Sequence, residues 1–183
     1  MAKTLTTRTM WNWSTPDGMP ANKVRGRIAA SQGIFMPGAP FYRDSSGTWT
    51  MQATTNATDD RIHGFCVGPV NAATTWPLIA EQAVNTEMYF EEVGLEDTYA
   101  VFVNANAADA AATDALIGND YGLDMDATAG TIGQTTMNTG DTTNVVVRCT
   151  DIVSRVEPSK HTTSDSPGIA LVRFLTAAAT AVA

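Results

Sequence analysis

The chain has 183 residues, of which 44% are hydrophobic and 16% are charged, and its formal net charge at pH 7 is −8. A chain of this length and apolar content can bury the core of one domain. It contains no apolar run of about 18 residues, which excludes a membrane-spanning helix, and its acidic balance excludes a general nucleic-acid-binding surface. We therefore expect neither a membrane nor a nucleic acid among its partners.

The cations of the chain are concentrated near its N-terminus. Residues 1–27 carry one acid, Asp17, and the five cations Lys3, Arg8, Lys23, Arg25 and Arg27. The same segment holds two tryptophans, and indole side chains often anchor contacts between proteins. We predict that residues 1–27 form an extended basic N-terminal arm. Its contacts with a partner protein or a neighbouring subunit are expected to use Lys3, Arg8, Trp11, Trp13, Lys23, Arg25 and Arg27.

Two other interpretations of residues 1–27 stay open. The segment can be an ordinary first strand that exposes its arginines, or a basic arm that binds nucleic acid, which the acidic remainder of the chain disfavours. The first residues lack the continuous apolar run of a signal peptide, so we expect synthesis in a cytoplasm. Only three lysines occur, Lys3, Lys23 and Lys160, which indicates a surface largely covered by partners.

Residues 28–183 are predicted to form a single β-rich domain. The segment 39–51 contains an extended run, the turn-forming sequence Asp-Ser-Ser-Gly and an alternating return, which together predict a hairpin. A third strand is expected at 62–67. Farther along the chain, strands are predicted at 87–93, 99–103, 144–153 and 168–175, and the turn after the first of these favours its pairing with the second.

The remaining segments are predicted to be less regular. Residues 105–117 are rich in alanine and end before Gly118, which predicts the helix of the chain. A turn that leads into an extended segment at 119–126, a Gly- and Thr-rich loop at 127–143 and a polar excursion at 158–167 complete the pattern. Several short strands predict a mainly β fold: a small β-barrel or β-sandwich with one short helix and the extended N-terminal arm.

The two cysteines of the chain lie in apolar runs that are typical of strands. Cys66 and Cys149 could form one disulfide. A thiol in such a run behaves as a small hydrophobic side chain, so two buried free thiols are favoured.

No pattern of residues predicts catalysis. His161, Ser164 and Asp165 have the residue types of a hydrolytic triad, but three residues of one short loop seldom converge as base, nucleophile and orienting group. The G-x-S-x-G pentapeptide of many serine hydrolases does not occur in the chain. We expect a protein that is not an enzyme.

Patterns for ligand binding are also weak. Asp120, Asp124 and Asp126 offer carboxylates to Ca²⁺, but they lack the glycine and terminal glutamate of an EF-hand, so a solvated acidic turn is favoured. No Cys-x-x-Cys pair and no Gly-rich phosphate loop occurs, and we expect no metal and no cofactor. The aromatic residues that could form a sugar-stacking face are Tyr42, Trp49, Trp76 and Tyr121. A carbohydrate-binding module therefore stays an alternative.

Four short motifs follow one another in the chain. They are GAPFYRDSSG at 38–47, IHGFCVG at 62–68, ALIGNDYGL at 115–123 and GIALVRFL at 168–175. In this order the motifs resemble the decoration, or cement, proteins of tailed-bacteriophage capsids, and they cover most of residues 33–175. The basic segment 1–27 is not part of the resemblance.

This resemblance implies a function and an assembly. Proteins of this kind are β-barrel or β-sandwich subunits, typically homotrimers, that lie on the outer capsid surface and bridge major capsid proteins. By this resemblance the chain is expected to be a virion structural protein that cements a phage capsid, with the major capsid protein as its partner. A phage tail or fibre adhesin, or a carbohydrate-binding β-module, is the alternative.

Overall fold

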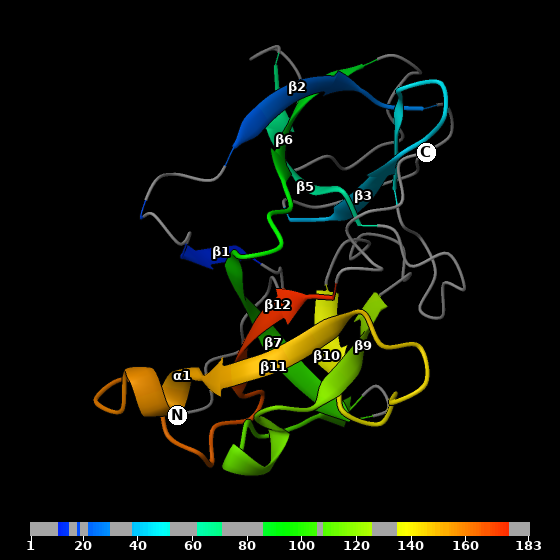
Figure 1. Cartoon of the computed structure of the whole chain (residues 1–183). Coiled ribbons are helices and arrows are strands. Elements are labelled where there is room, and N and C mark those ends of the chain that lie inside the picture. The colour runs from blue at the N-terminus through cyan, green and yellow to red at the C-terminus, as the bar shows by residue number, and fades with distance from the viewer. Residues whose placement is uncertain are drawn as a thin grey trace.

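A computed structural model gives the fold and describes residues 11–14, 18, 22–29, 38–51, 62–70, 86–105, 108–125 and 135–175. Its strands form two sheets, which lie one above the other in Figure 1. Each sheet closes on itself around its own core, and we call them the smaller barrel and the larger barrel. The prediction of a mainly β fold with one short helix is confirmed. Within the described residues, no helix has the length and hydropathy needed to cross a membrane.

The smaller barrel has five strands in the order β2-β6-β5-β3-β4. They are β2 (Lys23–Arg27), β6 (Glu87–Glu92), β5 (Gly64–Pro69), β3 (Pro40–Arg43) and β4 (Trp49–Met51). Neighbours in this order are antiparallel. A parallel bridge between Ile28, directly after β2, and Trp49 joins the two outer strands and closes the barrel.

One indole ring occupies much of the interior of the smaller barrel. Trp49 is 1% exposed and stacks on Phe90, with ring centroids 4.2 Å apart and an interplanar angle of 7°. Gly26 leaves room for the indole, because a Cβ at this position would overlap the indole nitrogen. Met88 and Phe90 take the inward positions of β6, since successive side chains of a strand point to opposite faces.

The hairpin predicted at 39–51 is confirmed as the pair β3–β4. Its turn is held by Asp44, whose carboxylate accepts hydrogen bonds from the backbone and hydroxyl groups of Ser46 and Thr48. These bonds, led by the two hydroxyl donors, lower the pKa of Asp44 to about 2. Gly47 completes the turn with a φ of 81°, a left-handed conformation that glycine adopts without strain. The strand predicted at 62–67 is present as β5 and pairs with β3.

The larger barrel belongs to a seven-stranded sheet with the order β1-β7-β10-β9-β11-β12, in which β8 also pairs with β7. These strands are β1 (Trp11–Ser14), β7 (Thr98–Ala105), β8 (Ala108–Asp109), β9 (Asp120–Met125), β10 (Thr135–Asn138), β11 (Val147–Ile152) and β12 (Ile169–Phe174). Because β12 also pairs with β7, the sheet closes, and β1 and β8 extend its wall along β7. Strand β10 runs parallel to β7 and antiparallel to β9.

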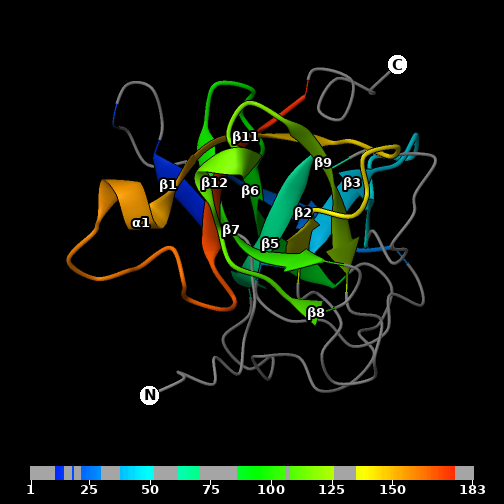
Figure 2. The ribbon, with the colours of Figure 1, turned by 90° about the horizontal axis from the view of Figure 1, so that it is seen from below.

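Many medium-sized side chains fill the larger barrel. Val101 of β7, Met137 of β10 and Val172 of β12 are fully buried members of this core. On the outside of the barrel, Trp13 packs in a cluster with Val153. That residue begins α1 (Val153–Val156), which Figure 2 shows beside β1.

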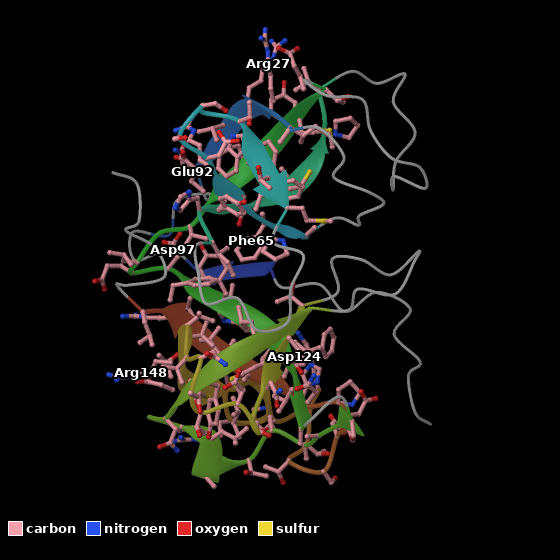
Figure 3. The ribbon with its side chains drawn as sticks, turned by 90° about the vertical axis from the view of Figure 1, so that its right-hand side faces the viewer. Arg27, Phe65, Glu92, Asp97, Asp124 and Arg148 are labelled. Carbon is pink, nitrogen blue, oxygen red and sulfur yellow. The ribbon has the colours of Figure 1, made fainter. Side chains whose placement is uncertain are left out.

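An aromatic cluster joins the two barrels. The ring centroid of Phe65, on β5 of the smaller barrel, lies 5.5 Å from that of Tyr99 and 6.0 Å from that of Phe174, both in the larger barrel. Figure 3 shows Phe65 between the two sheets. Phe65 is 3% exposed and belongs to the core cluster of the larger barrel. The barrels are therefore held together by buried apolar surface as well as by the chain that connects them.

The helix predicted at 105–117 is wrong. Its described part contains the short strand β8 and one turn of 3-10 helix, η1 (Asp114–Leu116). Alanine favours a helix, but an isolated short helix is marginal without tertiary support. Pairing of β8 with β7 decides the local structure instead, and among the described residues the short α-helix is α1.

Two predictions about strands are also wrong. Residues 87–93 and 99–103 do form strands, but β6 belongs to the smaller barrel and β7 to the larger one, so they do not pair with each other. The loop predicted at 127–143 contains β10, which lies between β7 and β9 with all four of its residues buried. Its backbone hydrogen bonds depend on partners distant in the sequence, which local periodicity does not reveal.

Residues 11–14 and 23–27, within the predicted arm, form β1 of the larger barrel and β2 of the smaller barrel. The alternative interpretation, an ordinary strand with exposed arginines, describes β2. The division of the chain at residue 27 stays a prediction. The two buried free thiols are confirmed, and burial raises the pKa of both Cys66 and Cys149 to about 12.

Candidate functional site: the outer face of strands β2 and β6

Three of the predicted contact residues lie on one face of the smaller barrel. Lys23, Arg25 and Arg27 occupy the outward positions of β2, while Val24 and Gly26 alternate with them and are less exposed. Val24 packs against the core, and Gly26 faces Trp49. Figure 3 shows Arg27 at the end of the smaller barrel that is farthest from the larger barrel. Because Gly26 must face Trp49, the residues that alternate with it along β2 must point outward.

Acids of β6 lie opposite these cations. Register places Lys23 opposite Glu91 and Arg27 opposite Glu87. Glu87 forms ion pairs with Arg25 and, at 3.7 Å, with Arg27. The hydrogen bond from Arg25 lowers the pKa of Glu87, and the same bond raises the pKa of Arg25. The face is therefore a pattern of alternating charges rather than a purely basic strip.

An exposed aromatic residue, Tyr89, lies at the centre of this face. It is 42% exposed and pairs with Arg25 on β2 and with Gly68 on β5. A Cβ at Gly68 would meet no atom within 4 Å, so the sheet beside the tyrosine is open. Burial raises the pKa of Glu91, the next outward residue of β6, although Lys23 acts in the opposite direction. An aromatic centre with a charged rim is the usual anatomy of a protein interface.

Sequence reasoning missed Tyr89 as a candidate. The signal was present in the alternation of 87–92, where Met88 and Phe90 point inward and Tyr89 must point outward. Its neighbour Gly68 appeared in the sequence analysis only as the last residue of the motif at 62–68. The β-bulge between Cys66 and Gly68 sets which residue of β5 faces Tyr89. That register depends on tertiary pairing.

The other predicted contact residues lie elsewhere or outside the described residues. Trp11 and Trp13 are in β1, which pairs with β7 of the larger barrel. The side chain of Trp13 packs against its own chain, in the cluster that contains Val153. Lys3 and Arg8 lie outside the described residues. The structure thus brings together Lys23, Arg25 and Arg27 but does not place Trp13 on the same face.

The residues with triad chemistry form a hydrogen-bonded turn. The carboxylate of Asp165 accepts hydrogen bonds from the backbone and hydroxyl of Thr162, which lower its pKa, and lies 3.7 Å from Nδ1 of His161. The Ser164 hydroxyl lies 3.0 Å from the Thr162 hydroxyl, and no hydrogen bond joins Ser164 to His161. These contacts close a turn and do not activate a nucleophile.

Residues 119–126 were predicted to be a turn that leads into an extended segment, and residues 120–125 form strand β9. Arg148 donates two hydrogen bonds, of 2.7 and 3.0 Å, to the carboxylate of Asp120. This hydrogen bonding lowers the pKa of Asp120. Asp124 lies four positions along the strand, roughly 13 Å away. Asp126 lies outside the described residues. Among the described residues, no three His, Cys, Asp or Glu side chains gather as a metal site.

The sugar-stacking face predicted from Tyr42, Trp49, Trp76 and Tyr121 is wrong for two of its members. Trp49 fills the smaller barrel and Tyr121 is buried in the core of the larger barrel. Tyr42 is half-buried, and Trp76 lies outside the described residues. The exposed aromatic of the described surface is instead Tyr89.

No protein-family model matches the chain, and no curated protein shows significant sequence similarity to it.

Proposed function

We propose that this protein is a virion structural protein that decorates and cements the outer surface of a phage capsid by bridging major capsid proteins. The observation that carries the proposal is the outer face of β2 and β6, where exposed Tyr89 lies between Arg25 and the open backbone at Gly68. Tyrosine is enriched at binding hot spots because it supplies a large apolar ring and a hydroxyl group with few rotatable bonds.

The charges around Tyr89 suit a partner with both signs of charge. Arg25 and Arg27 share Glu87, while Lys23 faces Glu91, so the rim offers donors and acceptors in alternation. Exposed ion pairs contribute little affinity. They do weaken the binding of a partner that would place like charges opposite each other. The face would therefore select one register on a capsid subunit while the aromatic centre supplies most of the affinity.

Two barrels joined by a buried aromatic cluster make a firm spacer between two capsid subunits. The contact of Phe65 with Tyr99 and Phe174 limits motion of one barrel relative to the other. We propose a homotrimer without enzymatic activity, since several copies of one face would bind a shell with an avidity that exceeds the affinity of each contact. This role is consistent with a surface that carries few lysines.

The face is tested by the binding of the purified protein to capsids assembled without it. Replacing Tyr89→Ala should weaken binding about 30-fold or more, the effect of losing a hot-spot residue. Leu95→Ala is the matched control, because Leu95 is similarly exposed, at 38%, but lies in the turn between the barrels. Equal binding of the wild type and the tyrosine variant would disprove the face, and failure of the wild type to bind would disprove the function.

The contribution of the N-terminal segment needs a shorter deletion than the whole predicted arm. Removing residues 1–27 would delete β1 and β2 and so remove a strand from each sheet. Deleting residues 1–10 removes Lys3 and Arg8 but keeps both strands. If these two cations bind the capsid, the deletion should weaken binding and reduce its dependence on salt. Unchanged binding would exclude them from the contact.

A further inference from the structure

Strand β2 is paired along only one of its two sides within the described residues. Its pairing with β6 runs the length of the strand, from Lys23 to Arg27. On the other side, the described pairing is a bridge between Ile28, directly after β2, and Trp49 of β4. Figure 1 shows β2 at the top of the smaller barrel, away from the larger barrel. The side of β2 that precedes this bridge is therefore an edge of the sheet.

Hydrogen bonds at the two ends of β2 show which of its backbone groups face β6. The amide of Ile28 donates to the carbonyl of Thr86, and the amide of Glu92 donates to the carbonyl of Asn22. In an antiparallel pair, the residues that exchange these bonds alternate along each strand with residues that do not. The even-numbered residues of β2 therefore direct their amides and carbonyls to β6.

The odd-numbered residues direct their backbone groups to the opposite side. Ala29 shows this direction, because its amide donates to the carbonyl of Trp49 on β4. Lys23 and Arg25 lie farther back along the same side, and no described strand pairs with them there. Their amides and carbonyls form an open edge, which we call the β2 edge. An open edge of this kind is a template on which another strand can pair.

The side chains of β2 oppose pairing of this edge with a second copy of the chain. Lys23, Arg25 and Arg27 all point to the outer face. Two β2 strands that pair antiparallel about their centres would place Arg25 opposite Arg25 and Lys23 opposite Arg27. Like charges that lie directly opposite each other destabilise a sheet, and charged edge residues discourage association between edges. The β2 edge therefore favours a partner with different side chains.

Strand β6 shows which side chains fit beside the cations of β2. Its register places Glu91 opposite Lys23 and Glu87 opposite Arg27. Arg25 and Arg27 both form ion pairs with Glu87, yet their side chains stay 57% and 65% exposed. A guanidinium group has five N–H donors, so each arginine can bind a second carboxylate from its other side. A strand on the β2 edge would therefore fit best with acidic residues at alternate positions, as in β6.

We propose that the β2 edge binds an extended segment of a partner protein that carries acidic residues at alternate positions. The backbone of this segment bonds the amides and carbonyls of Lys23 and Arg25, and its carboxylates lie beside the cations of β2. The inference rests on the proposed function for the identity of the partner, a major capsid protein. The edge from Lys23 to Arg25 is short, roughly 10 Å, so this contact adds to the one made by Tyr89 and does not replace it.

Two substitutions at position 23 separate the backbone of the edge from its charge. Lys23→Ala removes the charge, whereas Lys23→Pro also removes an amide that points away from β6, at the first position of a strand, where proline is tolerated. In binding to capsids assembled without the protein, Lys23→Pro should bind about tenfold more weakly than Lys23→Ala, because it loses a backbone hydrogen bond. Circular dichroism and the Tm establish that both variants fold. Equal binding of the two variants would overturn strand addition and leave the capsid function standing.

Titration of the isolated wild type with peptides, followed by NMR, tests the edge without variants and without capsids. A peptide of about seven residues that alternates glutamate with valine should slow the exchange of the Lys23 and Arg25 amides with solvent. A peptide that alternates lysine with valine is the matched control and should not. Protection by neither peptide, or equal protection by both, would overturn the inference. Protection by the acidic peptide in a protein that fails to bind capsids would support the edge and disprove the capsid function.

Discussion

The two barrels fill their interiors in different ways. The smaller barrel encloses one large indole, Trp49, stacked on Phe90 and accommodated by Gly26. The larger barrel packs a broader set of aliphatic and aromatic side chains, among them Val101 and Met137. The smaller barrel thus depends on close contacts around one large ring, whereas the larger barrel spreads its stability over many contacts.

This difference bears on function because the proposed contact face lies on the smaller barrel. Its outward residues are fixed by the inward ones: Gly26 must face Trp49, so Arg25 and Arg27 must face solvent. A change inside the smaller barrel should therefore disturb the face, whereas a change inside the larger barrel should lower stability and leave the face intact.

Loss of the indole should have the largest effect. Trp49→Ala is expected to lower the free energy of unfolding by about 3–5 kcal/mol, and to abolish binding through the face, because the cavity would let β2 and β4 collapse. Met137→Ala in the larger barrel should cost about 2–5 kcal/mol while capsid binding of the folded fraction stays unchanged. Urea unfolding and binding measurements compare the two. Loss of capsid binding by the folded methionine variant, or retained binding by the folded tryptophan variant, would contradict the contrast between the barrels.

The contact between the barrels should rank next. Phe65→Ala removes the ring that meets Tyr99 and Phe174, and we expect a loss of about 3 kcal/mol. The wild type should unfold in one calorimetric transition, while the variant should show two as the barrels become independent. One unchanged transition in the variant would mean that other contacts couple the barrels.

A single methyl group at Gly26 should have a smaller but clear effect. Gly26→Ala is expected to lower the free energy of unfolding by about 1–3 kcal/mol, because the added Cβ overlaps the indole. Gly68→Ala is the control on another strand of the same barrel, where a Cβ meets no atom within 4 Å, and its effect should be minor. Equal losses in the two variants would show that backbone entropy, and not the space for Trp49, makes Gly26 necessary.

The smallest effect is expected at the turn of the β3–β4 hairpin. The pKa of Asp44 is about 2 in the folded protein, below the ordinary value of 3.8 for an aspartate. Because the folded pKa is the lower one, the carboxylate stabilises the fold above pH 3.8, and this contribution is lost as the pH falls towards 2. Asp44→Asn should therefore be less stable than the wild type near neutral pH and nearly equal to it near pH 2. A difference that does not depend on pH would exclude the ionised carboxylate as its cause.

Local patterns predicted the strands whose residues alternate. The hairpin at 39–51 and the strands β5, β6, β7, β11 and β12 were all visible, because alternation or a continuous apolar run marks them. Strand β10 was not visible, because its four residues are buried on both faces by partners far away in the sequence. The alanine-rich segment at 105–117 was misread for the same reason: pairing with β7 outweighs a weak helix preference.

The candidate site was predictable only in part. The outward cations of β2 were identified, but their partners on β6 and the central Tyr89 depend on register, which no local pattern fixes. Trp13 was identified as an anchor for a partner, yet the structure packs it on its own chain. An aromatic residue in a basic segment indicates that its ring is buried in a contact. It does not reveal whether the contact is with a partner or within the same chain.

Cryo-electron microscopy of phage virions mixed with the purified protein tests the central proposal most directly. The account predicts that density for the protein lies on the outer capsid surface, with β2 and β6 of the smaller barrel, including Tyr89, against major capsid proteins. Absence of the protein from the shell, or its location in the tail, would contradict the proposed function.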